Sequence, residues 1–201
     1  MNTITHNTRT TEAKVVWVII GWALVSFYLG LTGLFTQMPR PIFGAVVIAI
    51  QTALIVAYFA NANFQRFSNT FSLKTIALFH AWRIFAGWIF LAHSNVLPET
   101  FINNAAYGDI VSGFLGLSVF VFGQTKLNHY IFNIVGLTDF FLAVGTGLYL
   151  TFSGEPKMES IIHLPLIMIP MFGVPLSGYT HFLALKKLSS LKSTRSLEAI
   201  N

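Results

Sequence analysis

Six apolar stretches separated by short polar segments account for most of this chain. They run over about residues 15–35, 41–60, 72–92, 104–123, 129–152 and 160–185. A helix of about 20 apolar residues is long enough to cross the hydrocarbon core of a bilayer. The pattern therefore predicts an all-α integral membrane bundle of six transmembrane helices over residues 15–185, with a polar tail at 1–14 and a basic tail at 186–201.

The segments between these stretches predict turns and kinks. The first apolar run is longer than the core of a secretory signal peptide and lacks a small-x-small cleavage site, so we expect it to stay as an uncleaved helix. Residues 61–70 are polar and are expected to form a loop. Pro165, Pro170 and Pro175 interrupt the last stretch and should kink that helix, because proline removes a backbone donor.

The composition agrees with a lipid-covered protein. Hydrophobic residues make up 54% of the chain and charged residues only 9%, whereas a soluble domain carries about 25% charged residues. The net charge of +5 comes from basic residues that flank the apolar runs. This placement is typical of topology signals, so the expected partner is the lipid bilayer and not a nucleic acid. A homo-oligomer and a larger membrane complex both stay open.

The basic residues also predict the orientation. Six spans place both termini on one side, and nine Lys and Arg residues fall on that side: Arg9, Lys14, Arg66, Lys74, Lys126, Lys186, Lys187, Lys192 and Arg195. Arg40 and Lys157 fall on the other side. The positive-inside rule then puts both termini in the cytoplasm. The predicted location is the cell membrane, and a bacterial inner membrane in particular.

A charged residue near the middle of the third apolar stretch is the main chemical signal. Arg83 lies about ten residues from either end of that helix. An arginine at the centre of a membrane helix costs about 2.5–3.5 kcal/mol on insertion scales, so it needs a partner. Asp109 and Asp139, in the fourth and fifth stretches, are the candidate partners.

The faces of the helices support a shared polar core. Each ionisable residue has glycine, alanine or serine at helical spacing, and small residues allow helices to approach closely in lipid. We expect His80, Gln51 and Tyr58 to flank Arg83, Asp109 and Asp139. One interpretation is a site that binds a small ligand or conducts protons. The alternative is a structural clamp within a non-catalytic accessory subunit.

Histidines near the helix ends raise a redox alternative. His80 and His181 fall in the cytoplasmic third, and His93 and His163 fall near the outer ends, a layering that suits two b-type haems. The spacing argues in part against two haems, because His80 and His93 lie about 140° apart around an ideal helix and cannot both face the bundle axis without distortion. Haem b therefore stays an alternative cofactor.

Other chemistry is not indicated. The chain has no cysteine, which excludes disulfides, thiol nucleophiles and cysteine-ligated clusters. It contains neither His-Glu-x-x-His nor Gly-x-Ser-x-Gly. The sequence thus predicts no metal site, and it leaves open whether the protein is an enzyme and what it binds.

Several short motifs lie between His80 and His181. They are His80-x-Trp82-Arg83, Leu97-Pro98-x-x-Phe101, Gly108-Asp109, Pro165-Leu-Ile-Met-Ile-Pro170, Val174-Pro175-Leu176 and His181. Together they resemble those of a group of small bacterial multi-spanning membrane proteins of unassigned function. The resemblance covers about residues 79–185 and implies no activity, and it favours treating Arg83, Asp109 and the last helix as a set.

Overall fold

The structure is a computed structural model that describes residues 2–123 and 125–191. Over these ranges the chain is helical and contains no strand, which confirms the all-α prediction. Lys192 and Arg195, which the orientation argument used, lie outside the described residues, and so does the side chain of Arg9.

Eight α-helices follow one another along the described chain: α1 (Asn2–Thr32), α2 (Arg40–Ala60), α3 (Ala62–Thr70), α4 (Leu73–Phe79), α5 (Trp82–Ala92), α6 (Glu99–Phe122), α7 (Lys126–Phe152) and α8 (Val174–Ser190). Three tighter or wider turns connect them: the 3₁₀ segments η1 (Leu34–Gln37) and η2 (Pro156–Ile162), and the π-helical η3 (Ile169–Gly173).

Five helical segments are long and apolar enough to cross a membrane. They are Ala13–Thr32, Arg40–Ala60, Leu73–Ala92, Glu99–Phe122 and Lys126–Phe152.

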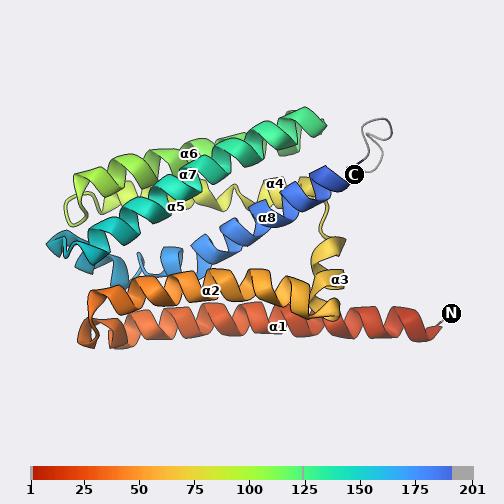
Figure 1. Ribbon diagram of the computed structural model, residues 1–201, viewed down its shortest axis with the longest axis horizontal. Coiled ribbons are helices and arrows are strands. Elements are labelled where there is room, and N and C mark those ends of the chain that lie inside the picture. The colour runs from red at the N-terminus through yellow and green to blue at the C-terminus, as the bar shows by residue number, and fades with distance from the viewer. Residues whose placement is uncertain (1, 124, 192–201) are drawn as a thin grey trace.

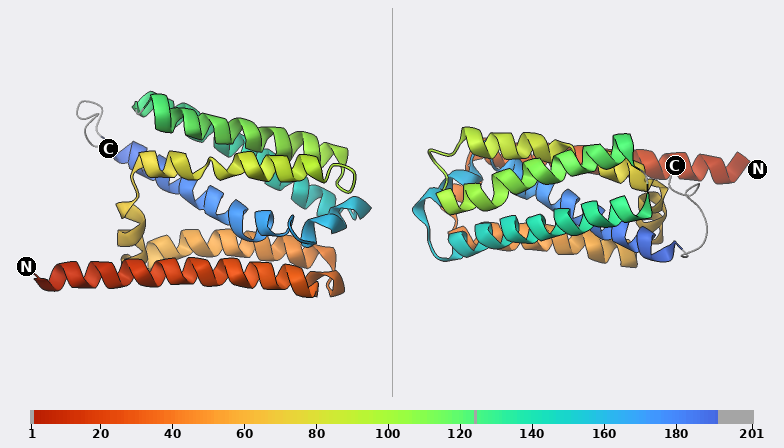
Figure 2. Two further views of the ribbon diagram at one scale, coloured as in Figure 1. Left: turned by 180° about the vertical axis from the view of Figure 1, so that it is seen from behind. Right: turned by 90° about the horizontal axis from the view of Figure 1, so that it is seen from above.

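The helices form an elongated bundle, and α8 runs through its middle (Figure 1). The long helices α6 and α7 lie side by side, and α5 packs on α6. Helix α8 contacts both α7 and α2, whereas α1 lies at the periphery and contacts mainly η1, α3 and η3. The start of α1 and the end of α8 lie at the same end of the bundle (Figures 1 and 2). We call it the terminal end.

The third apolar stretch is two helices instead of one. A turn at His80 and Ala81 separates α4 from α5, and there the amides of Ala81, Arg83 and Ile84 each donate to the carbonyl three residues earlier. Such tighter bonding is common where a helix is interrupted. The interruption lies just before Arg83, at the level of the polar core, and α4 and α5 together still form one apolar segment, Leu73–Ala92.

Residues 61–70 are not a loop as predicted, because most of them form α3. Asn61 caps this helix by accepting hydrogen bonds from the amides of Asn63 and Phe64. Phe67 and Ser68 are buried against the bundle. The segment is polar on average, yet its aromatic residues recur at helical spacing, and tertiary burial of that face stabilises the helix.

The sixth predicted helix is also different, because its first half is not α-helical. The chain passes through η2, a turn with a cis Leu164–Pro165 peptide bond and η3 before α8 begins at Val174. Pro170 lies in the π-helical turn, and Pro175 lies in the first turn of α8. The α-helix proper therefore begins only at Val174, directly after the π-helical turn that contains Pro170.

Glycines let α6 approach the backbone of its neighbours. A Cβ atom at Gly116 would lie 2.7 Å from the carbonyl oxygen of Ala77, and one at Gly113 would lie 2.8 Å from the amide nitrogen of Ile84. These separations are below normal contact, so only glycine fits without a shift of the neighbouring helix. The close approach of α6 to α4 and α5 brings Asp109 within reach of Arg83.

Candidate functional site

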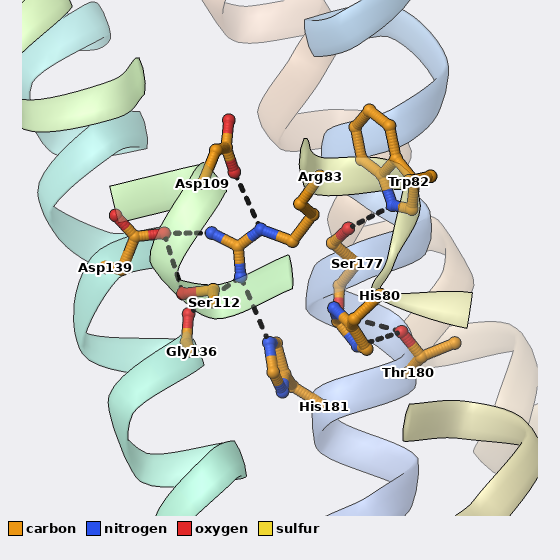
Figure 3. A network of polar contacts seen from close by, with 10 residues as sticks. All are labelled: His80, Trp82, Arg83, Asp109, Ser112, Gly136, Asp139, Ser177, Thr180 and His181. Atoms are coloured by element: carbon orange, nitrogen blue, oxygen red, sulfur yellow. Dashed lines mark hydrogen bonds and ion pairs between the residues drawn. The ribbon is translucent and has the colours of Figure 1, made fainter. Parts of the chain in front are cut away.

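Arg83 is the centre of a buried polar network (Figure 3). Its side chain is 2% exposed. Nε donates to Asp109 Oδ1 at 2.7 Å, and Nη2 donates to Asp139 Oδ2. Nη1 donates to the carbonyl oxygen of Gly136 at 3.2 Å and lies 3.5 Å from His181 Nε2. One guanidinium thus joins α5 to α6, α7 and α8.

The two carboxylates occupy different surroundings. Asp139 also accepts a hydrogen bond from Ser112 Oγ at 3.4 Å and lies against Gly108, where a Cβ atom would overlap its carboxylate. Asp109 bonds Arg83 through one oxygen only, and its second oxygen points away from the guanidinium (Figure 3). Among the described residues this second oxygen of Asp109 has no hydrogen-bond partner, and burial makes a free charge costly.

Neighbouring contacts determine the tautomer of His181. Asn133 Nδ2 donates to the carbonyl oxygen of His129 at 2.7 Å, so the amide oxygen of Asn133 faces His181 Nδ1 at 2.9 Å. That oxygen can only accept, so His181 Nδ1 carries the proton. His181 Nε2 is then an acceptor directed at Arg83.

His80 lies one layer further from the carboxylates. Its ring packs on that of His181 with centroids 4.0 Å apart. Thr180 Oγ1 lies 3.1 Å from His80 Nε2 and within hydrogen-bond distance of the carbonyl oxygens of Leu176 and Ser177. His80 Nδ1 is buried, with no hydrogen-bond partner among the described residues.

The histidine positions do not fit the predicted haem pairs. An iron held by His80 and His181 would need a porphyrin between two rings that are instead in direct contact. Both ring nitrogens of His181 also have polar neighbours already. His93 Nδ1 bonds the carbonyl oxygen of Ile89 in its own helix, and His163 is exposed in the turn after η2. The geometry therefore argues against haem in this bundle.

Two other predicted site residues make no hydrogen bond with Arg83 among the described residues. Gln51 packs against Gly178 in α8, where its Oε1 is buried without a hydrogen-bond partner among the described residues. Tyr58 is fully buried nearer the terminal end, where its hydroxyl bonds Asn69 Oδ1 at 3.3 Å and Lys186 Nζ lies 4.9 Å from its ring centroid. The prediction that Tyr58 flanks Arg83 is wrong.

A cavity of about 80 Å³ lies beside the network. Arg83 and Asp109 form its polar end, and it extends between α2, α5, α6, α7 and α8 toward η2. Its walls are mainly aromatic and aliphatic, with four phenylalanines from four helices: Phe43, Phe90, Phe101 and Phe140. The arrangement resembles a small-ligand pocket, in which apolar walls surround a few polar groups.

A second, larger cavity lies on the other side of the network. It measures about 790 Å³ and lies between α1, α3, α4 and α8, toward the terminal end. Thr180, which bonds His80, is part of its wall. A hydrogen bond links His80 to Thr180 at this cavity, and a polar contact links His181 to Arg83. Between them, the rings of His80 and His181 pack on each other, and no hydrogen bond joins the two in the described structure. The smaller cavity begins at Arg83.

Sequence reasoning found the three charged residues but missed several of their partners. Ser112, Gly136 and Asn133 complete the network through a hydroxyl, a backbone carbonyl and an amide. Asn133 carried a usable signal, because a buried amide in an apolar helix needs a polar partner. The Gly136 carbonyl gave no signal in the sequence, because every residue carries a backbone carbonyl.

Residues 41–189 match a family described as Domain of unknown function (DUF8737). The chain belongs to this family. The matched range contains every residue of the Arg83 network and both histidines next to it, whereas α1 precedes it. No curated protein and no solved structure matches the chain. The family match does not test the resemblance to small bacterial membrane proteins, which stays a prediction, as does a bacterial origin.

Proposed function

We propose that the protein is a six-span membrane protein with both termini in the cytoplasm, as in a bacterial inner membrane. The chain from η2 to α8 would form the sixth span beside the five apolar segments. Basic residues support this orientation, because those described at the terminal end outnumber Arg40 and Lys157 at the opposite end. The terminal-end residues are Lys14, Arg66, Lys74, Lys126, Lys186 and Lys187.

The proposed function is proton binding and proton movement at the Arg83 network. The observation that carries it is that one guanidinium lies between two buried carboxylates. With both carboxylates ionised, the group has a net charge of −1 in a medium of low dielectric constant, which is costly. A proton on Asp109 or Asp139 removes that charge. Intramembrane carboxylates of this kind are typical of proton relays.

Anion binding is less well supported by the same geometry. Arg83 already has four polar contacts, two of them with carboxylates. A guanidinium has only five N–H groups, so little donor capacity is left for an incoming anion. The excess charge also has the wrong sign for anion binding.

The two cavities support movement of the proton as well as binding. One lies between Arg83 and the outer end, and the other reaches Thr180 from the terminal end. Between them lie the imidazoles of His80 and His181, which can each accept or donate a proton. A proton entering from either side therefore meets a titratable group. Transfer between the two packed imidazoles requires a ring rotation or a bridging water, because no hydrogen bond joins them in the described structure.

Proton flux in liposomes tests this function. We expect the purified protein to accelerate the decay of an imposed pH difference, measured with an entrapped pH indicator. Asp109→Asn should return the rate to that of protein-free liposomes. Glu99→Gln changes an exposed carboxyl at the start of α6 and should leave the rate unchanged. Wild-type protein that does not accelerate the decay would overturn the proposal.

A structural clamp in an accessory subunit is the second candidate. It is favoured by the number of helices that Arg83 joins, since contacts with α6, α7 and α8 would lock the bundle. Infrared spectroscopy separates the two. A protonated carboxyl at neutral pH that disappears in Asp109→Asn or Asp139→Asn supports the proton site, whereas two ionised carboxylates in the wild type support the clamp.

A further inference from the structure

The smaller cavity has a distinct chemical character at its polar end. Among the residues that line it, Arg83 and Asp109 are the only ionisable ones. The N–H groups of Arg83 are directed at Asp109, Asp139, Gly136 and His181. What the cavity end offers to a ligand is therefore the second oxygen of Asp109, a residue that is only 7% exposed.

The neutral hydroxyl groups of the walls already have hydrogen-bond partners. Thr151 Oγ1 donates to the carbonyl oxygen of Gly147 at 2.7 Å, and Ser177 Oγ accepts from Trp82 Nε1 at 3.2 Å. Ser177 still has its own O–H as a neutral donor. The charged hydrogen-bonding capacity at the polar end is an acceptor with negative charge, and it favours a cation that can donate.

The remaining wall favours an organic cation over a metal ion. Alkali and alkaline-earth ions require several oxygen ligands, as the 6–8 around calcium illustrate, and this cavity offers one free carboxylate oxygen. Phe43, Phe90, Phe101 and Phe140 instead provide aromatic surface. Aromatic rings attract ammonium groups and are used to recognise them.

We infer that this cavity binds a small organic ammonium ion, such as methylammonium, in exchange for the proton of the Arg83 network. The ammonium N–H donates to Asp109, the carboxyl proton leaves to water, and the net charge of the group returns to zero. No covalent bond of the ligand forms or breaks. The inference rests on the proposed function, because it requires a proton to be present before the cation binds.

The outer end of the cavity indicates the side of entry. Met158 and Ile161 of η2 line that end. The turn before η2 is held to the start of α2 by Arg40, which donates to the carbonyl oxygens of Gly154 and Glu155 at 3.1 Å. The cavity lies on the η2 side of Arg83, so the cation is expected to enter from the side opposite the termini.

Two measurements on the full-length protein in detergent test the inference. Methylammonium chloride is titrated while the melting temperature is recorded, and a pH indicator in weakly buffered solution records proton release. We expect a rise in the melting temperature and about one proton released per cation bound. Methanol and potassium chloride, which lack either the charge or the organic group, should produce neither.

Variants assign the response to this cavity. Asp109→Asn should abolish proton release by methylammonium. Phe140→Leu should weaken binding about twofold to thirtyfold, the range expected for loss of a cation–π contact. Phe114→Leu is the matched control, because Phe114 is 55% exposed and does not line the cavity. Its affinity should equal that of the wild type.

Several outcomes would overturn the inference. They are an equal response to potassium ions or methanol, no response to methylammonium, and equal weakening by Phe140→Leu and Phe114→Leu. If Asp109→Asn fails to fold, the comparison of methylammonium, methanol and potassium chloride on the wild type still tests the inference, and so do Phe140→Leu and Phe114→Leu. Proton flux without a methylammonium response would reject the cation site and leave the proposed function standing. Methylammonium binding with proton release but without flux would keep the cation site and proton binding, and it would reject proton movement.

Discussion

Gly108 leaves the carboxylate of Asp139 just enough room, because a Cβ atom on Gly108 would overlap that carboxylate. Helix α6 therefore helps to position Asp139 through the absence of a side chain. The same helix carries Asp109 on the adjacent position of the chain. One turn of α6 thus places one acid directly and makes space for the other.

Gly108→Ala is expected to destabilise the bundle despite the higher helix propensity of alanine. Forcing a methyl group into a packed site costs about 1–3 kcal/mol, against a gain of up to about 1 kcal/mol from propensity. The measurement is the free energy of unfolding in mixed micelles titrated with denaturing detergent. Gly145→Ala in α7 is the control, because nothing lies within 4 Å of its Cβ position. It should be neutral or stabilising, and equal effects of both changes would contradict the argument.

Arg83→Met is expected to lower the free energy of unfolding by more than Gly108→Ala does. It leaves two buried carboxylates without a counter-charge, and breaking a buried ion pair in this way costs about 3–5 kcal/mol. Adding Asp109→Asn and Asp139→Asn to the same chain should recover most of the loss, because no charge is then left unpaired. Arg66→Met, at an exposed position in α3, should change the free energy of unfolding by less than about 1 kcal/mol. A triple variant no more stable than Arg83→Met would show that charge is not the cause.

The sequence predicted the contacts of Arg83 for a physical reason that holds in any bilayer. A central guanidinium is too costly to face lipid, and only Asp109 and Asp139 were available as acids at similar depth. Both contacts are present in the structure. The spacing of small residues on the same faces pointed to helix packing at these positions, and Gly108, Gly113 and Gly116 do bring α6 close to its neighbours.

The errors arose where spacing along one helix says nothing about depth or about neighbours. Tyr58 shares a face with Gln51, yet seven residues are about 10 Å along a helix, so Tyr58 reaches a different layer of the bundle. The contact between His181 and Arg83 depends on the path from η2 to α8, which three prolines change in ways that periodicity cannot describe. Average polarity concealed α3, because nine residues are too few for a strong periodic signal.

Asn133→Leu is expected to remove the acceptor that holds the proton on His181 Nδ1. A buried donor left without a partner costs about 1–3 kcal/mol, or the ring adopts the other tautomer and directs an N–H at Arg83. Nitrogen-15 NMR of labelled histidine distinguishes the tautomers directly. Asn133→Asp retains an acceptor at the same position and should keep the wild-type tautomer. A wild-type spectrum in Asn133→Leu would show that Asn133 does not determine it.

The orientation and the sixth span can be tested with single cysteines, because the chain contains none. Asn95, Lys157 and Ser190 are all exposed in the described structure, and they lie between α5 and α6, in η2 and at the end of α8. If η2 to α8 crosses the membrane, Lys157→Cys and Ser190→Cys lie on opposite sides. A membrane-impermeant maleimide should then label Asn95→Cys and Lys157→Cys in intact cells, and Ser190→Cys only after permeabilisation. Labelling of Lys157→Cys and Ser190→Cys under the same condition would place η2 and the end of α8 on one side and limit the protein to five spans.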